Sequence, residues 1–418
     1  MKLFRNIIHL FIWQGSTYLI PLIVTPYLTR TLGIGGYGVF GFSLAVTTYG
    51  MLLTDWGFNQ SAAQKVARAE DDPEQLRILF WNTMVARVGL AILAMILLMI
   101  VTLTVPMLRA IWPVLLAASL VIVSTAFSAN FFLQGMQKMG AFAISALMGR
   151  LAIIPLMLFF VHTPQDVMMA ALIQNGTQII SAVTSIVIAA RIVPLFPMRI
   201  DVRGAFGEIV DGWHLFLSQF SVSLYTQANA VVVGFVAGTN QAGLLTASQR
   251  ISQAFQQLVT PINMAVYPMV NRLSHSDPPA AVRLMFRVLA GQAAFSALLS
   301  LGMFLVSPYI VPIFLGHNFA AATPVVQMLS LLPFFAGVSN VLGGNMLLPL
   351  GLRGPFMFSL MASGAVNICL LFLLTPTYGA YGGAVSAVLT EIFLCVAMGG
   401  GLIANRAVFT RMRAGERP

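Results

Sequence analysis

Long amide side chains form the clearest chemical pattern in this sequence. Between residues 249 and 263, polar side chains recur at spacings of four, three, four and three residues, which places them on one face of a helix. The set comprises Gln249, Gln253, Gln256, Thr260 and Asn263, with Arg250 and Gln257 beside it. Amides donate and accept hydrogen bonds, which suits sugar hydroxyls, and Arg250 adds a cation for an acidic group. The alternative is hydrogen bonding between helices of a bundle.

Three arginines lie within apolar stretches. Arg150 lies in the middle of the stretch 140–160, too deep to reach a membrane surface easily, so we expect it to face a protein interior or a water-filled cavity. There it either contacts an anionic substrate or forms a charge pair that orders the bundle. Arg87 and Arg250 lie nearer the ends of their stretches, where a long side chain can extend to the surface. Both are also candidates for contact with a substrate.

Two carboxylates lie within the apolar stretches. Glu391 is near the centre of the stretch 380–404, where it could exchange a proton or cation during transport or could neutralise an arginine such as Arg150. Asp55 lies at the end of the stretch 37–58, where we expect capping or gating rather than ion coupling.

Prolines mark candidate hinges. Pro21, Pro26 and Pro261 each remove a backbone hydrogen bond, so each is expected to kink its helix or to act as a hinge. Arg30, in a short connection between apolar stretches, is grouped with Asp55 as a gating candidate.

Motifs for metals and nucleotides are absent from the sequence. It contains neither a Gly-x-x-x-x-Gly-Lys-Ser/Thr loop nor a His-Glu-x-x-His pattern, and its two cysteines lie in apolar stretches without a neighbouring metal ligand. We therefore expect no metal, no cofactor and no direct use of ATP by this chain.

Composition identifies the elements that must hold these residues. Of 418 residues, 58% are hydrophobic and only 8% are charged, against roughly 25% charged residues in a soluble domain. Uncharged runs such as 6–29, 31–54 and 110–137 reach the roughly 20 residues that a membrane helix needs. Because these runs are continuously apolar and longer than a barrel strand, they exclude a β-barrel. The sequence predicts an all-α integral membrane protein.

Twelve membrane-spanning helices are predicted. Their approximate ranges are 7–28, 37–58, 81–103, 111–133, 140–160, 167–190, 213–236, 245–269, 288–311, 324–349, 355–374 and 380–404. The long uncharged runs are divided at Gly316-His317-Asn318 and at the Gly- and Pro-containing segment 375–379, because these residues break helices.

The chain divides into two predicted six-helix lobes. The N-terminal lobe covers 1–190, a cytoplasmic linker covers 191–212, and the C-terminal lobe with its short basic tail covers 213–418. An offset of 205 residues aligns Gly33 with Gly238 and Gly38 with Gly243. We expect parallel repeats related by a pseudo-two-fold axis along the membrane normal, as in transporters with a central site.

Basic residues predict the orientation of the chain. Most of the 22 lysines and arginines fall on the side that holds both termini, so both termini are expected to be cytoplasmic. The net charge of +10 reflects this topology and does not indicate nucleic-acid binding.

Several motifs resemble those of one known family. The runs 21–33 (PLIVTPYLTRTLG), 36–40 (GYGVF) and 53–59 (LTDWGFN) resemble the N-terminal signature of Wzx-type polysaccharide flippases. Tyr267-Pro268 and the run 271–273 are similar to a later part of the same family. The resemblance covers the whole chain through its 12-span, two-lobe plan.

The resemblance implies the fold of the multidrug/oligosaccharidyl-lipid/polysaccharide exporter superfamily. It further implies alternating-access movement of an undecaprenyl-diphosphate-linked oligosaccharide from the cytoplasmic to the periplasmic leaflet of the bacterial inner membrane, for O-antigen, capsule or exopolysaccharide assembly. Expected partners are this lipid-linked substrate, membrane lipids, and a polysaccharide polymerase with its chain-length protein. Such a protein is not an enzyme. The alternatives are an ion-coupled multidrug or cation antiporter of the same fold, and a membrane polysaccharide polymerase.

Overall fold

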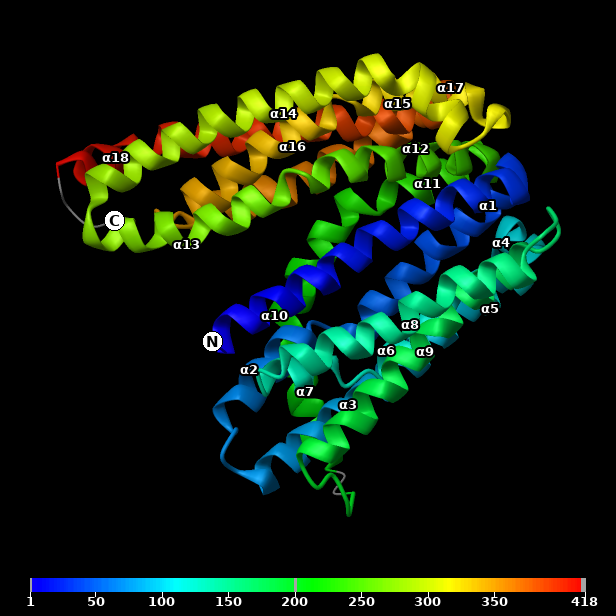
Figure 1. Cartoon of the computed structure of the whole chain (residues 1–418), viewed down its shortest axis with the longest axis horizontal. Helices are drawn as coiled ribbons and strands as arrows, with labels where there is room; N and C mark the ends of the chain where they lie inside the picture. The colour runs from blue at the N-terminus through cyan, green and yellow to red at the C-terminus, as the bar shows by residue number, and fades with distance from the viewer. Residues whose placement is uncertain (1, 199–200, 415–418) are drawn as a thin grey trace. The chain divides into compact units, whose positions relative to one another are not determined.

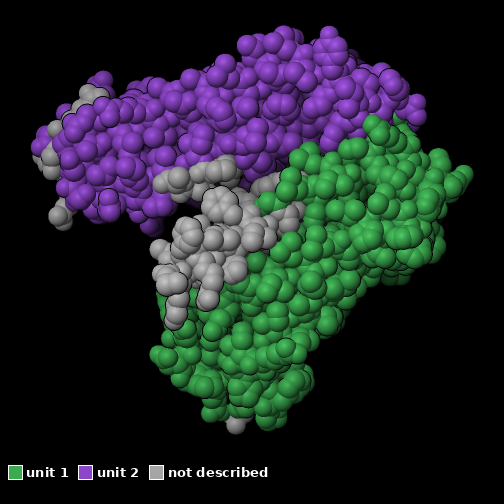
Figure 2. All heavy atoms as spheres, in the orientation of Figure 1, with its two compact units in different colours: residues 1–220 green, residues 221–418 purple. Residues whose placement is uncertain are grey.

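A computed structural model describes residues 2–198 and 201–414 of the chain. At residues 2–14, 16, 18, 221, 224, 225, 260, 261, 264, 265 and 413 only the backbone is described. The chain forms two compact units, residues 1–220 and 221–418, which Figure 2 shows in green and purple. The described residues form helices and no strand, so the predicted all-α fold is confirmed.

Among the described residues, unit 1 contains nine complete helices and the larger part of a tenth, which crosses the boundary at Phe220. They are α1 (Lys2–Asp55), α2 (Phe58–Arg68), α3 (Pro73–Thr104), α4 (Pro106–Ala110), α5 (Trp112–Ala118), α6 (Leu120–Ala126), α7 (Asn130–Gly135), α8 (Met139–Phe160), α9 (Val167–Ile192) and the larger part of α10 (Val202–Thr226). Figure 1 shows α8 and α9 side by side, and this pair forms the most extensive helix contact in the unit.

Unit 2 contains the end of α10 and the remaining helices. They are α11 (Ala228–Ala237), α12 (Thr239–Gln257), α13 (Thr260–Ser276), α14 (Pro278–Phe314), the 3₁₀ helix η1 (His317–Ala322), α15 (Thr323–Leu329), α16 (Leu332–Asn340), the π-helix η2 (Val341–Leu347), α17 (Arg353–Ala404) and α18 (Arg406–Arg413). The packing of α14 against α16, and of α16 against α17, can be followed in Figure 1.

Eight helical segments among the described residues are long and apolar enough to cross a membrane. Two of them, Leu19–Arg68 and Arg353–Ala404, each cover two of the predicted spans. The predicted spans 213–236 and 245–269 correspond instead to helices that are interrupted, α10–α11 and α12–α13. The structure is therefore consistent with 12 crossings in a multi-pass membrane protein.

Glycines divide the long helices at related positions. Gly33 interrupts α1 with φ 66° and ψ −177°, and Gly238 separates α11 from α12 with φ 90° and ψ 165°. Only glycine adopts this positive-φ, extended-ψ conformation readily, because it lacks a Cβ atom. The two residues are a pair at the 205-residue offset, so the repeat in the sequence coincides with a repeated backbone break.

A third glycine break is held by a side chain. Gly379 interrupts α17 with φ 54°, and the next backbone N–H, that of Ala380, donates to Oε1 of Gln241 at 2.9 Å. A donor freed by a helix break needs a replacement partner in an apolar environment. Gln241 of α12 supplies that partner within unit 2.

The first part of α10 packs on unit 1, which sets the unit boundary later than the predicted linker 191–212. Trp56 donates from Nε1 to the carbonyl oxygen of Ile209 at 2.8 Å, and its ring stacks on Phe216 with centroids 4.0 Å apart. Lys65 of α2 forms ion pairs with Glu208 at 2.9 Å and Asp211 at 2.7 Å. Because of these contacts, the boundary falls inside α10, between Phe220 and Ser221.

Candidate functional site

A polar cavity of about 300 Å³ lies inside unit 1. It is formed by α2, α7, α8 and α9, and it is lined by Asn59, Asn130, Gln134, Phe142, Ala146, Gly149, Arg150, Ile153, Thr177, Gln178 and Ser181. Four of these residues carry amides, and Arg150 is the one charged residue among them. The cavity therefore offers a cation together with several hydrogen-bonding amides and hydroxyls.

Arg150 lies on the wall of this cavity and is half-buried. Its Nη1 donates to Oγ1 of Thr17 in α1 at 2.6 Å. A guanidinium carries five N–H donors in a fixed planar fork, and it binds a phosphate or carboxylate through two of them at once. Thr17 holds one nitrogen of the guanidinium in place.

Gly149 allows the cavity wall to form. A Cβ atom at this position would lie 2.5 Å from the carbonyl oxygen of Thr177, closer than real Cβ contacts come. The absent side chain lets α8 pack directly against the backbone of α9 and brings Arg150 and Gln178 onto the same cavity.

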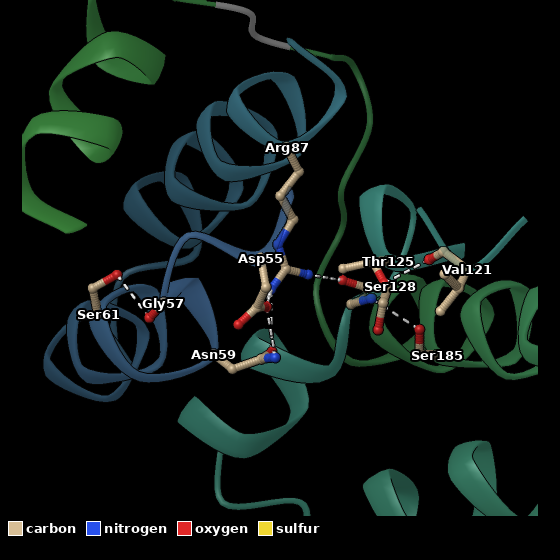
Figure 3. Close-up of polar contacts among 10 residues, drawn as sticks. Asp55, Gly57, Asn59, Ser61, Arg87, Val121, Thr125, Ser128 and Ser185 are labelled. Carbon is tan, nitrogen blue, oxygen red and sulfur yellow. Dashed lines mark hydrogen bonds and ion pairs between the residues drawn. The ribbon is translucent and has the colours of Figure 1, made fainter. Parts of the chain in front are cut away.

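A buried ion pair lies next to the cavity. Arg87 donates from Nη2 to Oδ1 of Asp55 at 2.9 Å and to Oδ1 of Asn59 at 3.1 Å, while Nδ2 of Asn59 donates to Oδ1 of Asp55 at 2.7 Å (Figure 3). The other end nitrogen, Nη1, donates to the carbonyl oxygen of Ser128 at 2.5 Å. Both ends of the Asn59 amide are thus fixed, and Asn59 also lines the cavity.

Arg87 does not extend to a membrane surface. Its side chain has no exposed area, and the rings of Phe131 and Phe58 lie 5.0 and 5.8 Å from its guanidinium carbon. Of the alternatives open for Arg87, extension to a membrane surface is excluded, because the side chain is buried and Asp55 compensates its charge inside the protein. In the structure Arg87 and Asp55 orient Asn59 and are not themselves on the cavity wall.

The amide stripe of the sequence is divided between two helices. α12 ends at Gln257 and α13 begins at Thr260, with i to i+3 backbone hydrogen bonds at Leu258 and Val259. Pro261 has no N–H to donate to the carbonyl of Gln257, which explains the interruption. Pro261 is the second residue of α13, and its side chain, like that of Thr260, lies outside the described residues. The predicted continuous face is thus broken.

The described members of the stripe differ in their surroundings. Arg250 and Gln253 are exposed and contact each other at 3.4 Å, and Gln249 is half-buried. Gln256 donates to Ser252 at 3.0 Å, and Asn263 accepts from Asn345 of η2 at 3.1 Å. Gln257 is half-buried. Gln256 and Asn263 thus make bundle contacts, whereas Arg250 and Gln253 remain accessible in unit 2.

Glu391 lies in α17 of unit 2, half-buried. Its Oε2 accepts a hydrogen bond from Ser339 of α16 at 3.1 Å. One turn further along α17, Cys395 donates to the carbonyl oxygen of Phe335, also in α16, at 3.2 Å. Glu391 therefore faces the α16–α17 contact.

The candidates Pro21, Pro26 and Arg30 lie on α1. Pro21 and Pro26 are accommodated within the helix, whose backbone departs from helical values at Gly33. Arg30 is exposed and lies one turn before that break. The backbone break belongs to the glycine rather than to either proline.

Sequence reasoning missed several residues of the cavity. Asn130 and Gln134 are separated by four residues at the end of a predicted span, and Gln178 and Ser181 by three residues within another. Both spacings place polar side chains on one helix face, which is the signal that could have found them. Among the described residues, no group of His, Cys, Asp and Glu could hold a metal ion.

Sequence comparison identifies the family. A family model described as "Polysaccharide biosynthesis protein" matches residues 3–274, more than half of the chain. The chain belongs to this family. The chain is 30% identical over 391 residues to the "Putative O-antigen transporter" of Escherichia coli (strain K12), covering 94% of both chains. It is 26% identical over 394 residues to a protein of the same name from Shigella dysenteriae, covering 94% and 98%. The family membership expected from the sequence motifs is confirmed.

Solved structures of transporters share the fold of this family member. The Lipid II flippase MurJ in an inward closed conformation matches with a TM-score of 0.75 and 12% identity, over 98% of this chain and 90% of that chain. An inward-facing multidrug resistance MATE family transporter of the MOP superfamily matches with a TM-score of 0.71 and 15% identity, over 98% and 99%. At these identities the likeness establishes the fold alone.

Proposed function

We propose that this protein translocates an undecaprenyl-diphosphate-linked oligosaccharide from the cytoplasmic to the periplasmic leaflet of the bacterial inner membrane. Support comes from its family and from relatives named for O-antigen transport. The glycan belongs to the O-antigen, capsule or exopolysaccharide class. The protein acts as a carrier and not as an enzyme.

The observation that carries the proposal is the cavity around Arg150. A lipid-linked oligosaccharide combines an anionic diphosphate with hydroxyl-rich sugars, and this cavity combines one guanidinium with four amides. Its volume of about 300 Å³ is at the lower end of ligand-binding pockets. It accommodates the diphosphate and the nearest sugar rather than a whole repeat unit.

The transport cycle we propose is alternating access by two lobes. The apolar tail stays in the bilayer while the polar head group moves through the protein from the cytoplasmic to the periplasmic side. Arg250 and Gln253, which are accessible in unit 2, are the second set of proposed head-group contacts. Both termini are placed in the cytoplasm on the basis of the basic residues. A polymerase and its chain-length partner would receive the translocated unit.

The test is the leaflet location of the lipid-linked oligosaccharide in cells that lack this protein. Wild type and Arg150→Lys should restore periplasmic delivery, Arg150→Lys less well because an ammonium lacks the planar fork of the guanidinium. Arg150→Ala should leave the substrate on the cytoplasmic face at normal expression. Arg283→Ala, at an exposed position of α14, is the matched control and should behave as wild type. Full delivery by Arg150→Ala would refute the role of this cavity.

Two other functions would each give a different experimental result. A multidrug or cation antiporter of the same fold would exchange protons for cationic drugs in vesicles, although a cavity whose one charged residue is an arginine disfavours cationic cargo. A polymerase would lengthen the glycan when the purified protein is given the lipid-linked sugar. Either result, with normal leaflet distribution in cells lacking the protein, would replace the flippase proposal.

A further inference from the structure

A second, apolar groove lies on unit 1, separate from the polar cavity. It has a volume of about 560 Å³ and is formed by the last turns of α3, by α4 and by α5. Its walls include Leu98, Met99, Leu115 and Leu116, and Met99 is 64% exposed. None of its lining residues lines the cavity around Arg150.

The two hydroxyls in the groove donate to backbone carbonyls of their own helical segments. Thr102 donates to the carbonyl oxygen of Leu98 at 2.7 Å, and Ser119 donates to that of Leu116 at 2.7 Å. A hydroxyl that donates to its own helix has no further proton to offer a ligand. Inside the groove, the structure therefore favours an apolar chain over a sugar.

One end of the groove carries a cation. Arg109 of α4 is exposed, lines the groove, and donates from Nη2 to the carbonyl oxygen of Leu103 near the end of α3. This contact anchors the guanidinium and uses one of its five donors, and the others can reach an anion. On the side of the membrane opposite the two termini, the sequence predicts only two basic residues in loops, and Arg109 is one of them.

A tryptophan lies beside this cation. Trp112, the first residue of α5, lines the groove and is 55% exposed. Tryptophan is enriched at the depth of lipid headgroups, where its ring contacts the acyl region and its N–H contacts the polar layer. Arg109 and Trp112 thus mark the headgroup end of the groove, and Leu98 lies toward the acyl region.

We propose that this groove binds one anionic phospholipid of the leaflet next to the α3–α4 turn, with its phosphate at Arg109 and an acyl chain along α3 and α5. The groove combines a cation, an interfacial indole and apolar walls, which are the groups that the phosphate, glycerol and acyl chain of such a lipid would contact. The proposal does not depend on the transported substrate.

The experiment uses lipids with a dibrominated acyl chain, which quench nearby tryptophans. Full-length protein is placed in vesicles of phosphatidylcholine with increasing dibrominated phosphatidylglycerol or dibrominated phosphatidylcholine. The chain has five tryptophans, so the signal of Trp112 is taken as the difference between wild type and Trp112→Phe. An exposed ion pair contributes up to about 1 kcal/mol, so we expect about a two- to fivefold preference for phosphatidylglycerol.

Variants separate the headgroup contact from the groove. Arg109→Gln should remove the preference, and Arg109→Lys, which keeps the charge, should retain it. Thr102→Phe fills the groove and should lower quenching by both lipids. Arg283→Gln removes an exposed charge from α14 in unit 2 and should leave the preference unchanged.

Three results would overturn the proposal. The first is equal quenching of Trp112 by the two lipids in wild type. The second is a preference that survives Arg109→Gln or disappears equally in Arg283→Gln. The third is relief of quenching by undecaprenyl phosphate at a lower mole fraction than by unbrominated phosphatidylglycerol, which would assign the groove to a polyprenyl chain instead.

Discussion

Arg87 and Asp55 form an ion pair inside unit 1, with Nη2 of Arg87 2.9 Å from Oδ1 of Asp55 and no exposed area on the arginine side chain. The pair connects α3 to the end of α1 and orients Asn59, which lines the polar cavity. A charge in this position depends on its partner, because removing one partner leaves the other buried and uncompensated.

Asp55→Asn should therefore destabilise the protein strongly. We expect the free energy of unfolding to fall by about 3 kcal/mol, because Arg87 keeps its charge without an anionic partner. The measurement is denaturant unfolding of the purified protein in mixed micelles. The double variant Asp55→Leu with Arg87→Met should lose less stability than Asp55→Asn, because it leaves no unpaired charge.

The matched control for Asp55→Asn is Asp211→Asn, in the ion pair with Lys65. The Asp211 side chain is 58% exposed, so we expect a loss of no more than about 1 kcal/mol. Equal losses for Asp55→Asn and Asp211→Asn would contradict the importance of the buried pair.

Gly149→Ala should disturb the contact between α8 and α9. Because its Cβ would lie 2.5 Å from the carbonyl oxygen of Thr177, the helices must separate, at a cost of about 1–3 kcal/mol. Transport should fall with stability, since Gly149 lines the cavity. Gly291→Ala in α14, where nothing lies within 4 Å of the new Cβ, should leave stability within about 1 kcal/mol of wild type. Similar effects of both changes would argue against the close helix contact.

Lys65→Met should loosen the attachment of α10 to unit 1. Glu208 is buried, and in the variant its carboxylate loses the ion pair with Lys65. We expect faster amide hydrogen exchange in residues 203–212, measured by mass spectrometry on the purified protein. Arg68→Met, an exposed position one turn further along α2, should leave this exchange unchanged. Unchanged exchange in Lys65→Met would show that Trp56 and Phe216 hold α10 without the ion pairs.

Asp166 should make a pH-dependent contribution to stability. Its carboxylate accepts hydrogen bonds from the backbone N–H groups of His162 and Thr163, and these bonds hold the pKa of Asp166 below its usual range. The contribution is therefore fully present above the usual pKa of an aspartate and is lost as the pH falls through the lowered pKa. Thermal unfolding of wild type and Asp166→Asn should differ at pH 7 and converge on acidification. A stability difference that grows toward low pH would contradict a lowered pKa for Asp166.

Glu391→Gln tests ion coupling in unit 2. If Glu391 carries a proton or cation during transport, the variant should keep its fold but lose the dependence of translocation on the ion gradient. Ser339→Ala removes the hydrogen bond to Glu391 while keeping the carboxylate, so it should retain the dependence. Translocation by Glu391→Gln with a normal gradient dependence would leave Glu391 with only its contact to α16.

Local patterns in the sequence were sufficient to predict the apolar helices of the fold. Long uncharged apolar runs can satisfy their backbone groups in a membrane only as helices, so the spans follow from residues that are near one another in the chain. The paired breaks at Gly33 and Gly238 were also visible, because a glycine between two apolar runs marks a turn by itself.

Contacts between helices were decided by the tertiary structure. Spacing along a helix shows which residues share a face but not which other helix that face meets. Arg87 and Asp55 are 32 residues apart, and the sequence alone allowed either to reach a membrane surface. Similarly, the amides at Asn59, Asn130 and Gln178 become one cavity with Arg150 only when α2, α7, α8 and α9 pack together. Local sequence was therefore enough to place the apolar helices and two of their glycine breaks, whereas the packing of helices set which charges are paired and which line a cavity.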